Sequence, residues 1–312
     1  MKKVAFMFPG QGSQKVGMTK EIYEKSPDIQ SLYHQGNEIL GEDLVQTMFE
    51  GPNEKLTKTE NAQPALLLSS IAIFHLLRDH VQPVMTVGHS LGEYSALVAA
   101  GSLTLEEALP LVRARGQLME EAFPKGQGSM AAVLGMSKEE IETSLSSLDE
   151  IVDIANYNCP GQIVISGTKT GIEEATRTLK DAGAKRVLPL NVSGPFHSRL
   201  MKEASEKFTD YLDRVNIQNA TIPVYANVTA APVTQKEMIK ELLIKQLYSP
   251  VQFEQSILQM MEDEDLDAFI EVGSGTVLCG LLKKINRNMK TFAVHNIDSL
   301  ENFLDWYGKE SS

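Results

Sequence analysis

Apolar positions along the chain form short continuous runs that alternate with longer helical segments. The runs Val4–Phe8 and Val84–Val87 are short and almost wholly apolar, which is typical of strands buried on both faces. The segment 62–79 is apolar on nearly all sides and predicts a core helix, and a helix is also expected over 19–40. This alternation of buried strands and helices favours an α/β fold.

The pattern changes after Pro124–Gly128. Six predicted elements follow in the order β-α-β-β-α-β, with strands at 130–134, 152–155, 162–166 and 186–190 and helices at 137–147 and 171–181. This order is typical of a ferredoxin-like fold. We therefore expect a small inserted domain over 127–193, between the segments 1–126 and 194–312 of a larger α/β domain.

Helix-start signals and further periodic segments complete the larger domain. Thr104 and Glu107 occupy the two positions of a capping box, so a helix is expected to begin after Thr104. In the last segment we expect helices at 197–215, at 235–246 and from about Thr276, and strands at 224–226 and 268–271.

Composition excludes several classes of protein. The 312 residues include 29 Lys and Arg against 41 Asp and Glu, a net charge of −12, so the mean field of the chain repels nucleic acid. The two cysteines, Cys159 and Cys279, are too few for a disulfide scaffold and favour a reducing compartment. No apolar run is long enough for a membrane span, and the N-terminal run breaks at Pro9 before it could serve as a signal peptide. We expect a soluble cytoplasmic protein.

The strongest chemical signal is Gly88-His89-Ser90-Leu91-Gly92 between a predicted strand and a predicted helix. G-x-S-x-G in this context is a nucleophile elbow, in which a sharp turn exposes the serine hydroxyl. The helix that follows directs backbone N–H groups at an oxyanion beside Ser90, and the N–H of Leu91 is well placed for this role. The motif predicts that Ser90 is a nucleophile.

A serine nucleophile needs a base, and the chain has six histidines. His89 is expected to order the elbow, because neighbouring residues of a tight turn point apart. His197 lies in a loop that returns from the small domain to the large one, where it could face a cleft between them. Spacing alone ranks His197 only modestly above His295. The Gly-rich loop after the first strand does not fit a phosphate loop, but the N–H of Gln11 could serve as a second oxyanion donor.

Taken together, these segments resemble the malonyl-CoA:acyl carrier protein transacylase family over nearly the whole chain. The resemblance rests on the order and spacing of FPGQGSQ at 8–14, NAQPAL at 61–66, GHSLGEYSAL at 88–97, RARGQLM at 113–119, NCPGQIVISG at 158–167, GPFHS at 194–198, QLYSPVQF at 246–253 and EVGSGTVLCGL at 271–281. It implies an α/β-hydrolase-like large domain with a ferredoxin-like insertion, and a transfer of malonyl groups in fatty-acid synthesis.

The resemblance also implies a role for each matching position. Ser90 corresponds to the acylated nucleophile and His197 to its base, with the main-chain carbonyl of Gln246 orienting the imidazole in place of an acid. The N–H groups of Gln11 and Leu91 correspond to the oxyanion hole. The remaining substrate-binding positions are Arg115 for the malonyl carboxylate, Phe196 against an α-methyl group, and Asn158 in the lining of the cleft.

An arginine at position 115 favours malonyl over acetyl, because an acetyl substrate leaves a buried guanidinium without a partner. Arg113, two residues earlier, is expected on the helix surface. The implied partners are malonyl-CoA and acyl carrier protein, whose phosphopantetheine carries the thiol. Neither a metal nor another cofactor is expected, and the chain is expected to be a monomer.

Three alternatives stay open on the sequence. The chain could load a polyketide synthase, it could be a serine acyl hydrolase, or it could be a carrier-binding protein without activity. Docking of an acidic carrier to a chain of charge −12 needs a local basic patch. One candidate is Lys283, Lys284, Arg287 and Lys290, expected on the helix after Gly275 with 283, 287 and 290 on one face; the other is Lys180, Lys185 and Arg186.

Overall fold

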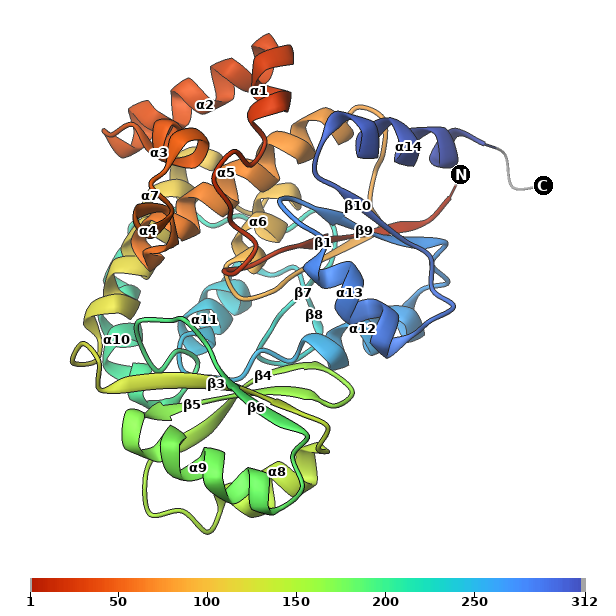
Figure 1. Cartoon of the computed structure of the whole chain (residues 1–312). Helices are drawn as coiled ribbons and strands as arrows, with labels where there is room; N and C mark the ends of the chain where they lie inside the picture. Colours follow the sequence, from red (N-terminus) through yellow and green to blue (C-terminus); the bar gives the residue numbers. More distant parts are fainter. Residues whose placement is uncertain (1, 310–312) are drawn as a thin grey trace.

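The computed structural model describes residues 2–309 and contains two sheets in two units (Figure 1). The strands of the large unit are β1 (Val4–Phe8), β2 (Met85–Gly88), β7 (Val224–Tyr225), β8 (Pro232–Val233), β9 (Ala268–Val272) and β10 (Thr291–Val294). Its helices are α1 (Lys20–Lys25), α2 (Pro27–Leu40), α3 (Leu44–Glu50), α4 (Asn53–Thr57), α5 (Thr59–Leu77), α6 (Gly92–Ala99), α7 (Leu105–Glu121), the 3-10 helix η1 (Arg199–Met201), α10 (Lys202–Leu212), α11 (Lys236–Gln246), α12 (Phe253–Asp263), α13 (Val277–Ile285) and α14 (Ile297–Gly308).

The large sheet is covered on both faces. Its order is β10-β9-β1-β2-β7-β8, with β8 antiparallel to β7 and all other pairs parallel. Alternate side chains of β1 enter different cores: Val4, Phe6 and Phe8 belong to a core shared with α5, α6 and α7, and Ala5 and Met7 to one shared with α12 and α13. A central parallel strand that is apolar at every position is therefore buried on both sides, as its sequence predicts.

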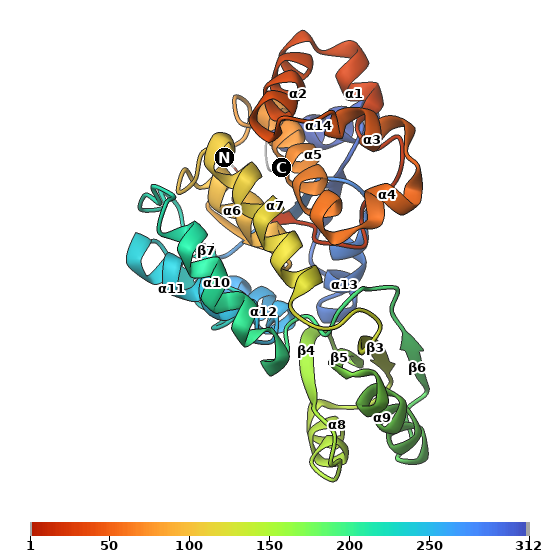
Figure 2. The same ribbon diagram turned by 90° about the vertical axis from the view of Figure 1, so that its left-hand side faces the viewer.

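The small unit consists of β3 (Gly128–Leu134), α8 (Lys138–Leu145), β4 (Val152–Cys159), β5 (Gln162–Thr168), α9 (Lys169–Asp181) and β6 (Arg186–Pro189). Its strands are antiparallel in the order β4-β5-β3-β6, and α8 and α9 pack on one face (Figure 1 and Figure 2). The predicted fold class is confirmed: an α/β-hydrolase-like large domain carries a ferredoxin-like small one. We propose 127–193 as the extent of the insertion, since β3 and β6 begin and end inside these limits.

Several predicted boundaries differ from the structure for local reasons. The helix expected over 19–40 is two helices, because Ser26 is extended and caps α2 with Pro27 in its first turn. The helix expected from His197 begins later, because His197 has a left-handed backbone (φ 57°) and a 3-10 turn precedes α10. The capping box of Thr104 and Glu107 is confirmed at the start of α7.

Some elements have no clear sequence signal. Helices α3 and α4 and strand β8 are too short to show a period, and α12, α14 and β10 were not predicted. The expectation that Lys283, Arg287 and Lys290 share a helix face is wrong, because α13 ends at Ile285 with an extended Asn286. Lys290 instead lies over the ring of Trp306, 5.0 Å from its centroid.

Candidate active site

Ser90 occupies a sharp turn between β2 and α6. Its backbone is left-handed, with φ of 53°, so the hydroxyl stands away from both elements. The turn is tightly packed: a Cβ on Gly92 would lie 2.0 Å from the carbonyl oxygen of Phe8, so only glycine fits there. Such a turn, between a buried strand and a helix, is the structure that the G-x-S-x-G motif requires.

His197 lies beside Ser90, although their positions in the chain are 107 apart. Its Nε2 is 2.8 Å from Ser90 Oγ, and its Nδ1 is 2.8 Å from the backbone carbonyl oxygen of Gln246. Because a carbonyl only accepts, Nδ1 carries the proton and Nε2 is left to accept from the serine hydroxyl. Burial, and then the charge of Arg115, lower the pKa of His197 to about 3. The imidazole is therefore neutral near pH 7, as a base must be.

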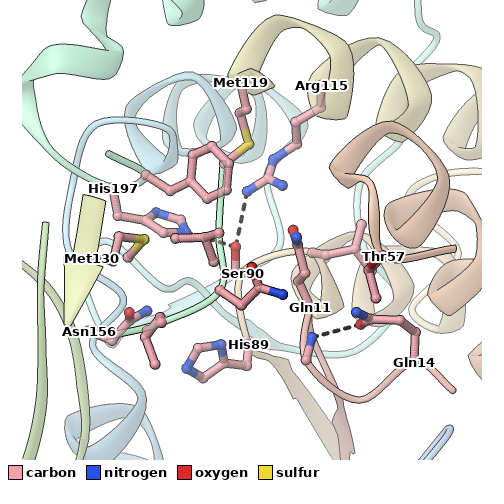
Figure 3. A pocket seen from close by; sticks show the side chains of 16 residues that line it. Gln11, Gln14, Thr57, His89, Ser90, Arg115, Met119, Met130, Asn156 and His197 are labelled. Carbon is pink, nitrogen blue, oxygen red and sulfur yellow. Dashed lines mark hydrogen bonds between the residues drawn. The ribbon is translucent and has the colours of Figure 1, made fainter. Parts of the chain in front are cut away.

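Arg115 reaches the same hydroxyl from a different direction than His197 (Figure 3). It comes from α7, is 1% exposed, and its Nη2 donates to Ser90 Oγ at 3.2 Å. Neutral side chains hold the guanidinium: Nη2 donates to Gln246 Oε1 and Nη1 to Gln63 Oε1, both at 2.8 Å. Arg113 pairs with Glu42 in a partly exposed position, as expected of a residue at the helix surface.

The loop after β1 contacts the elbow. A Cβ on Gly10 would lie 2.2 Å from the carbonyl oxygen of His89, so the two turns approach as closely as backbones can. This approach places Gln11 and Leu91 in the lining of one cavity with Ser90. The backbone N–H groups of Gln11 and Leu91 donate no hydrogen bond to any residue within 2–309. Both are therefore available to an oxyanion.

The cavity at Ser90 has a volume of about 380 Å³. Its walls include the apolar side chains of Phe196, which is 5% exposed, Met119 and Met130, beside the polar groups that contact Ser90 (Figure 3). Apart from Asn158, the residues singled out in the sequence are brought together here: Ser90, His197, Gln11, Leu91, Arg115 and Phe196 line the cavity, and Gln246 lies behind His197.

Asn158, which the resemblance assigns to the lining of the cleft, does not line this cavity. Asn156 lines the cavity, whereas the side chain of Asn158 binds His89, with 2.8 Å between Oδ1 and Nε2. Both asparagines lie on β4, whose pairing with β5 shifts register near each of them, so alternation along the strand does not indicate which one faces the cavity. His89 thus orders the elbow, as expected, by binding the small domain.

Four buried polar side chains behind the cavity had no role assigned from the sequence, which singled out only the main-chain carbonyl of Gln246. Asn227, Glu93, Gln63 and the amide of Gln246 bind Ser90, Arg115 or one another. The available signal was weak: a polar residue in a largely apolar helix, as for Gln63 in α5. Over the described part of the chain, no cluster of His, Cys, Asp and Glu could hold a metal, and no helix is long and apolar enough to cross a membrane.

The sequence matches the acyl transferase domain family over residues 5–298. It is 52% identical to the malonyl CoA-acyl carrier protein transacylase of Bacillus subtilis (strain 168), with 96% of each chain covered. The fold is similar to the crystal structure of an acyl carrier protein S-malonyltransferase from Vibrio cholerae, with a TM-score of 0.94 and 41% identity over 96% of this chain and 99% of that one. It is equally similar, at a TM-score of 0.94 and 38% identity over 97% and 99%, to a malonyl-transacylase in complex with a type II PKS acyl-carrier protein.

Proposed function

Because this chain belongs to the acyl transferase family, as a malonyl-CoA:acyl carrier protein transacylase of fatty-acid synthesis, we propose that Ser90 carries the malonyl group between its two substrates. The observation behind this proposal is the hydrogen-bonded chain from Ser90 through His197 to the Gln246 carbonyl, with Arg115 on the same hydroxyl. A nucleophile, a base and a fixed cation meet at one atom.

Acylation begins when His197 Nε2 takes the hydroxyl proton and Ser90 Oγ attacks the thioester carbon of malonyl-CoA. The carbonyl electrons move onto oxygen, and the N–H groups of Gln11 and Leu91 stabilise the resulting oxyanion. When the oxyanion collapses, the C–S bond breaks and the imidazolium returns its proton to the CoA sulfur. A malonyl ester remains on Ser90. The thiol of the carrier's phosphopantetheine then attacks this ester, and the same steps run in reverse.

Arg115 binds the free carboxylate of the malonyl group in this proposal. The guanidinium already lies 3.2 Å from the atom that becomes acylated, so a carboxylate two carbons from the carbonyl is within its reach. Neutralising the guanidinium also removes one of the causes that depress the pKa of His197, which makes the imidazole a stronger base once malonyl is bound. Phe196 narrows the same wall and disfavours an α-methyl group.

The chemistry exchanges a thioester for an ester and back, with no change of oxidation state. The residues present supply the nucleophile, the base and the oxyanion donors, so we propose a reaction without a metal or redox cofactor. We propose a monomeric enzyme, since all these groups come from one chain.

The carrier protein is proposed to dock beside the small domain on basic residues. Lys283, Lys284 and Arg287 are exposed, and Lys284 Nζ donates to Gln162 Oε1 of β5 at 3.2 Å, which places this group where the two domains meet. The second candidate is the exposed group Lys180, Lys185 and Arg186, at the end of α9 and the start of β6.

Intact-mass measurement after mixing the protein with malonyl-CoA tests the proposal. We expect the mass of one malonyl group on the wild-type chain and none on Ser90→Ala. Transfer to a carrier protein, without release of free malonate, distinguishes a transferase from a hydrolase. Full labelling of Ser90→Ala would contradict the assignment of the nucleophile.

A further inference from the structure

Glu93 is a buried carboxylate that the proposed mechanism does not use. It lies in the first turn of α6, is 2% exposed, and its Oε2 accepts hydrogen bonds from Asn227 N–H at 3.0 Å and from Gln246 Nε2 at 2.7 Å. We propose that Glu93 is a positioning residue that holds the elbow through Asn227 and the malonyl-binding arginine through Gln246. The inference rests on the proposed function and assigns a further residue to the same site.

The first arm of this network holds the backbone of Ser90. Asn227 Oδ1 accepts from Ser90 N–H at 2.8 Å, and Asn227 Nδ2 donates to the carbonyl of Gly88 at 2.6 Å, so one side chain spans the turn. Gln246 Nε2 donates to the carbonyl of Ser90 at 3.1 Å. A left-handed serine persists only where its surroundings hold it. The two residues that do so both donate to Glu93.

The second arm sets the direction of Arg115. The amide of Gln246 has one donating and one accepting end. Because Nε2 donates to the carboxylate of Glu93, Oε1 is turned toward Arg115 and accepts from Nη2 at 2.8 Å. A flipped amide would place its NH2 group against the guanidinium and its oxygen against the carboxylate. Glu93 therefore fixes the polarity of this amide, and with it the nitrogen that reaches Ser90 Oγ.

A positioning role for Glu93 has a different effect on substrate choice from that of an ordinary buried hydrogen-bond acceptor. A residue that only supports α6 would affect all acyl substrates equally when removed. A residue that positions Arg115 would affect the malonyl group more than the acetyl group, because only malonyl has a carboxylate for the guanidinium.

Three variants test this difference by the rate of Ser90 acylation with malonyl-CoA and with acetyl-CoA. Glu93→Gln keeps an oxygen that can accept both hydrogen bonds, so we expect a malonyl-to-acetyl ratio within about threefold of the wild type. Glu93→Ala leaves Asn227 and Gln246 without an acceptor, and the ratio should fall at least tenfold. Glu93→Asp withdraws the oxygens by one methylene and should lower the ratio in the same direction, which decides the question if Glu93→Ala does not fold.

Two controls make the result specific. Glu271 is also buried and accepts from two backbone N–H groups, those of Leu278 and Cys279, so Glu271→Ala should lower thermal stability without changing the ratio. In an Arg115→Ala chain, Glu93→Ala should produce no further fall in the ratio, because the group it positions is gone.

An unchanged ratio in Glu93→Ala and Glu93→Asp, or an equal fall without Arg115, would overturn the proposal. Failure of the proposed function looks different, since the wild-type chain itself would then take up no malonyl group.

Discussion

The guanidinium of Arg115 donates a hydrogen bond of 3.2 Å to the hydroxyl oxygen of Ser90. A permanent cation thus lies against the nucleophile, and its hydrogen-bond acceptors Ser90, Gln63 and Gln246 are neutral side chains. In the proposed mechanism the malonyl carboxylate pairs with this buried positive charge, and the same charge adds to burial in lowering the pKa of His197.

Replacing Arg115 should alter substrate choice. Arg115→Ala should lose malonyl transfer by about a thousandfold, because a buried guanidinium–carboxylate pair is worth several kcal/mol, while acetyl transfer falls much less. The measurement is kcat/KM for malonyl-CoA and acetyl-CoA in parallel. Arg113→Ala, on the same helix but paired with Glu42, is the matched control and should keep both rates. An equal loss for the two substrates would make Arg115 structural.

The pH dependence of acylation should move when Arg115 is removed. Burial and the Arg115 charge hold the pKa of His197 near 3, so the base is lost only as pH falls through about that value. Removing the positive charge raises this pKa toward its usual 6.5, and the acid limb should move to higher pH. The profile is recorded with acetyl-CoA, which needs no arginine.

Glu93 needs a separate control in that experiment, because burial raises its pKa to about 7. A step near pH 7 that disappears in Glu93→Gln belongs to Glu93, and the remaining limb reports His197. A limb that stays in place in Arg115→Ala would contradict the predicted coupling between the arginine and the base.

Gly92 should not tolerate a side chain. A Cβ at this position would lie 2.0 Å from the carbonyl oxygen of Phe8, so Gly92→Ala must push α6 from β1. We expect about 3 kcal/mol or more of lost unfolding free energy, together with loss of acylation. Gly280→Ala in α13, where no atom lies within 4 Å of the new Cβ, is the control and should be neutral or stabilising. Urea unfolding of the two variants decides between them.

Docking of the carrier protein should depend on a basic patch. Reversing Lys284 and Arg287 to glutamate should raise KM for the carrier several-fold at low salt, and this effect should shrink as salt screens the charges. Acylation by malonyl-CoA should change much less. Reversal of Lys185 and Arg186 is the matched comparison. If only that second pair raises KM, the carrier docks at β6.

Much of the local structure of this chain can be predicted from its sequence alone. The buried run Val4–Phe8, the capping box at Thr104 and the β-α-β-β-α-β order of the small domain are read from spacing, because period and steric preference act over a few residues. The elbow at Ser90 belongs to the same class, since its glycines and its strand-to-helix context are contiguous. The helix boundaries at Ser26 and His197 were not predicted, because each depends on the backbone conformation of a single residue.

Only the tertiary structure decided how the site is assembled. Spacing barely separated His197 from His295, and the resemblance to a family was needed to prefer it, whereas the fold places its Nε2 2.8 Å from Ser90 Oγ. The fold also places Asn156, and not Asn158, in the lining of the cavity. It brings Asn227 and Glu93 behind the nucleophile. Each of these contacts joins distant segments through one or two hydrogen bonds, whose partners are set by how the sheets and helices pack. A short sequence pattern contains no trace of such packing.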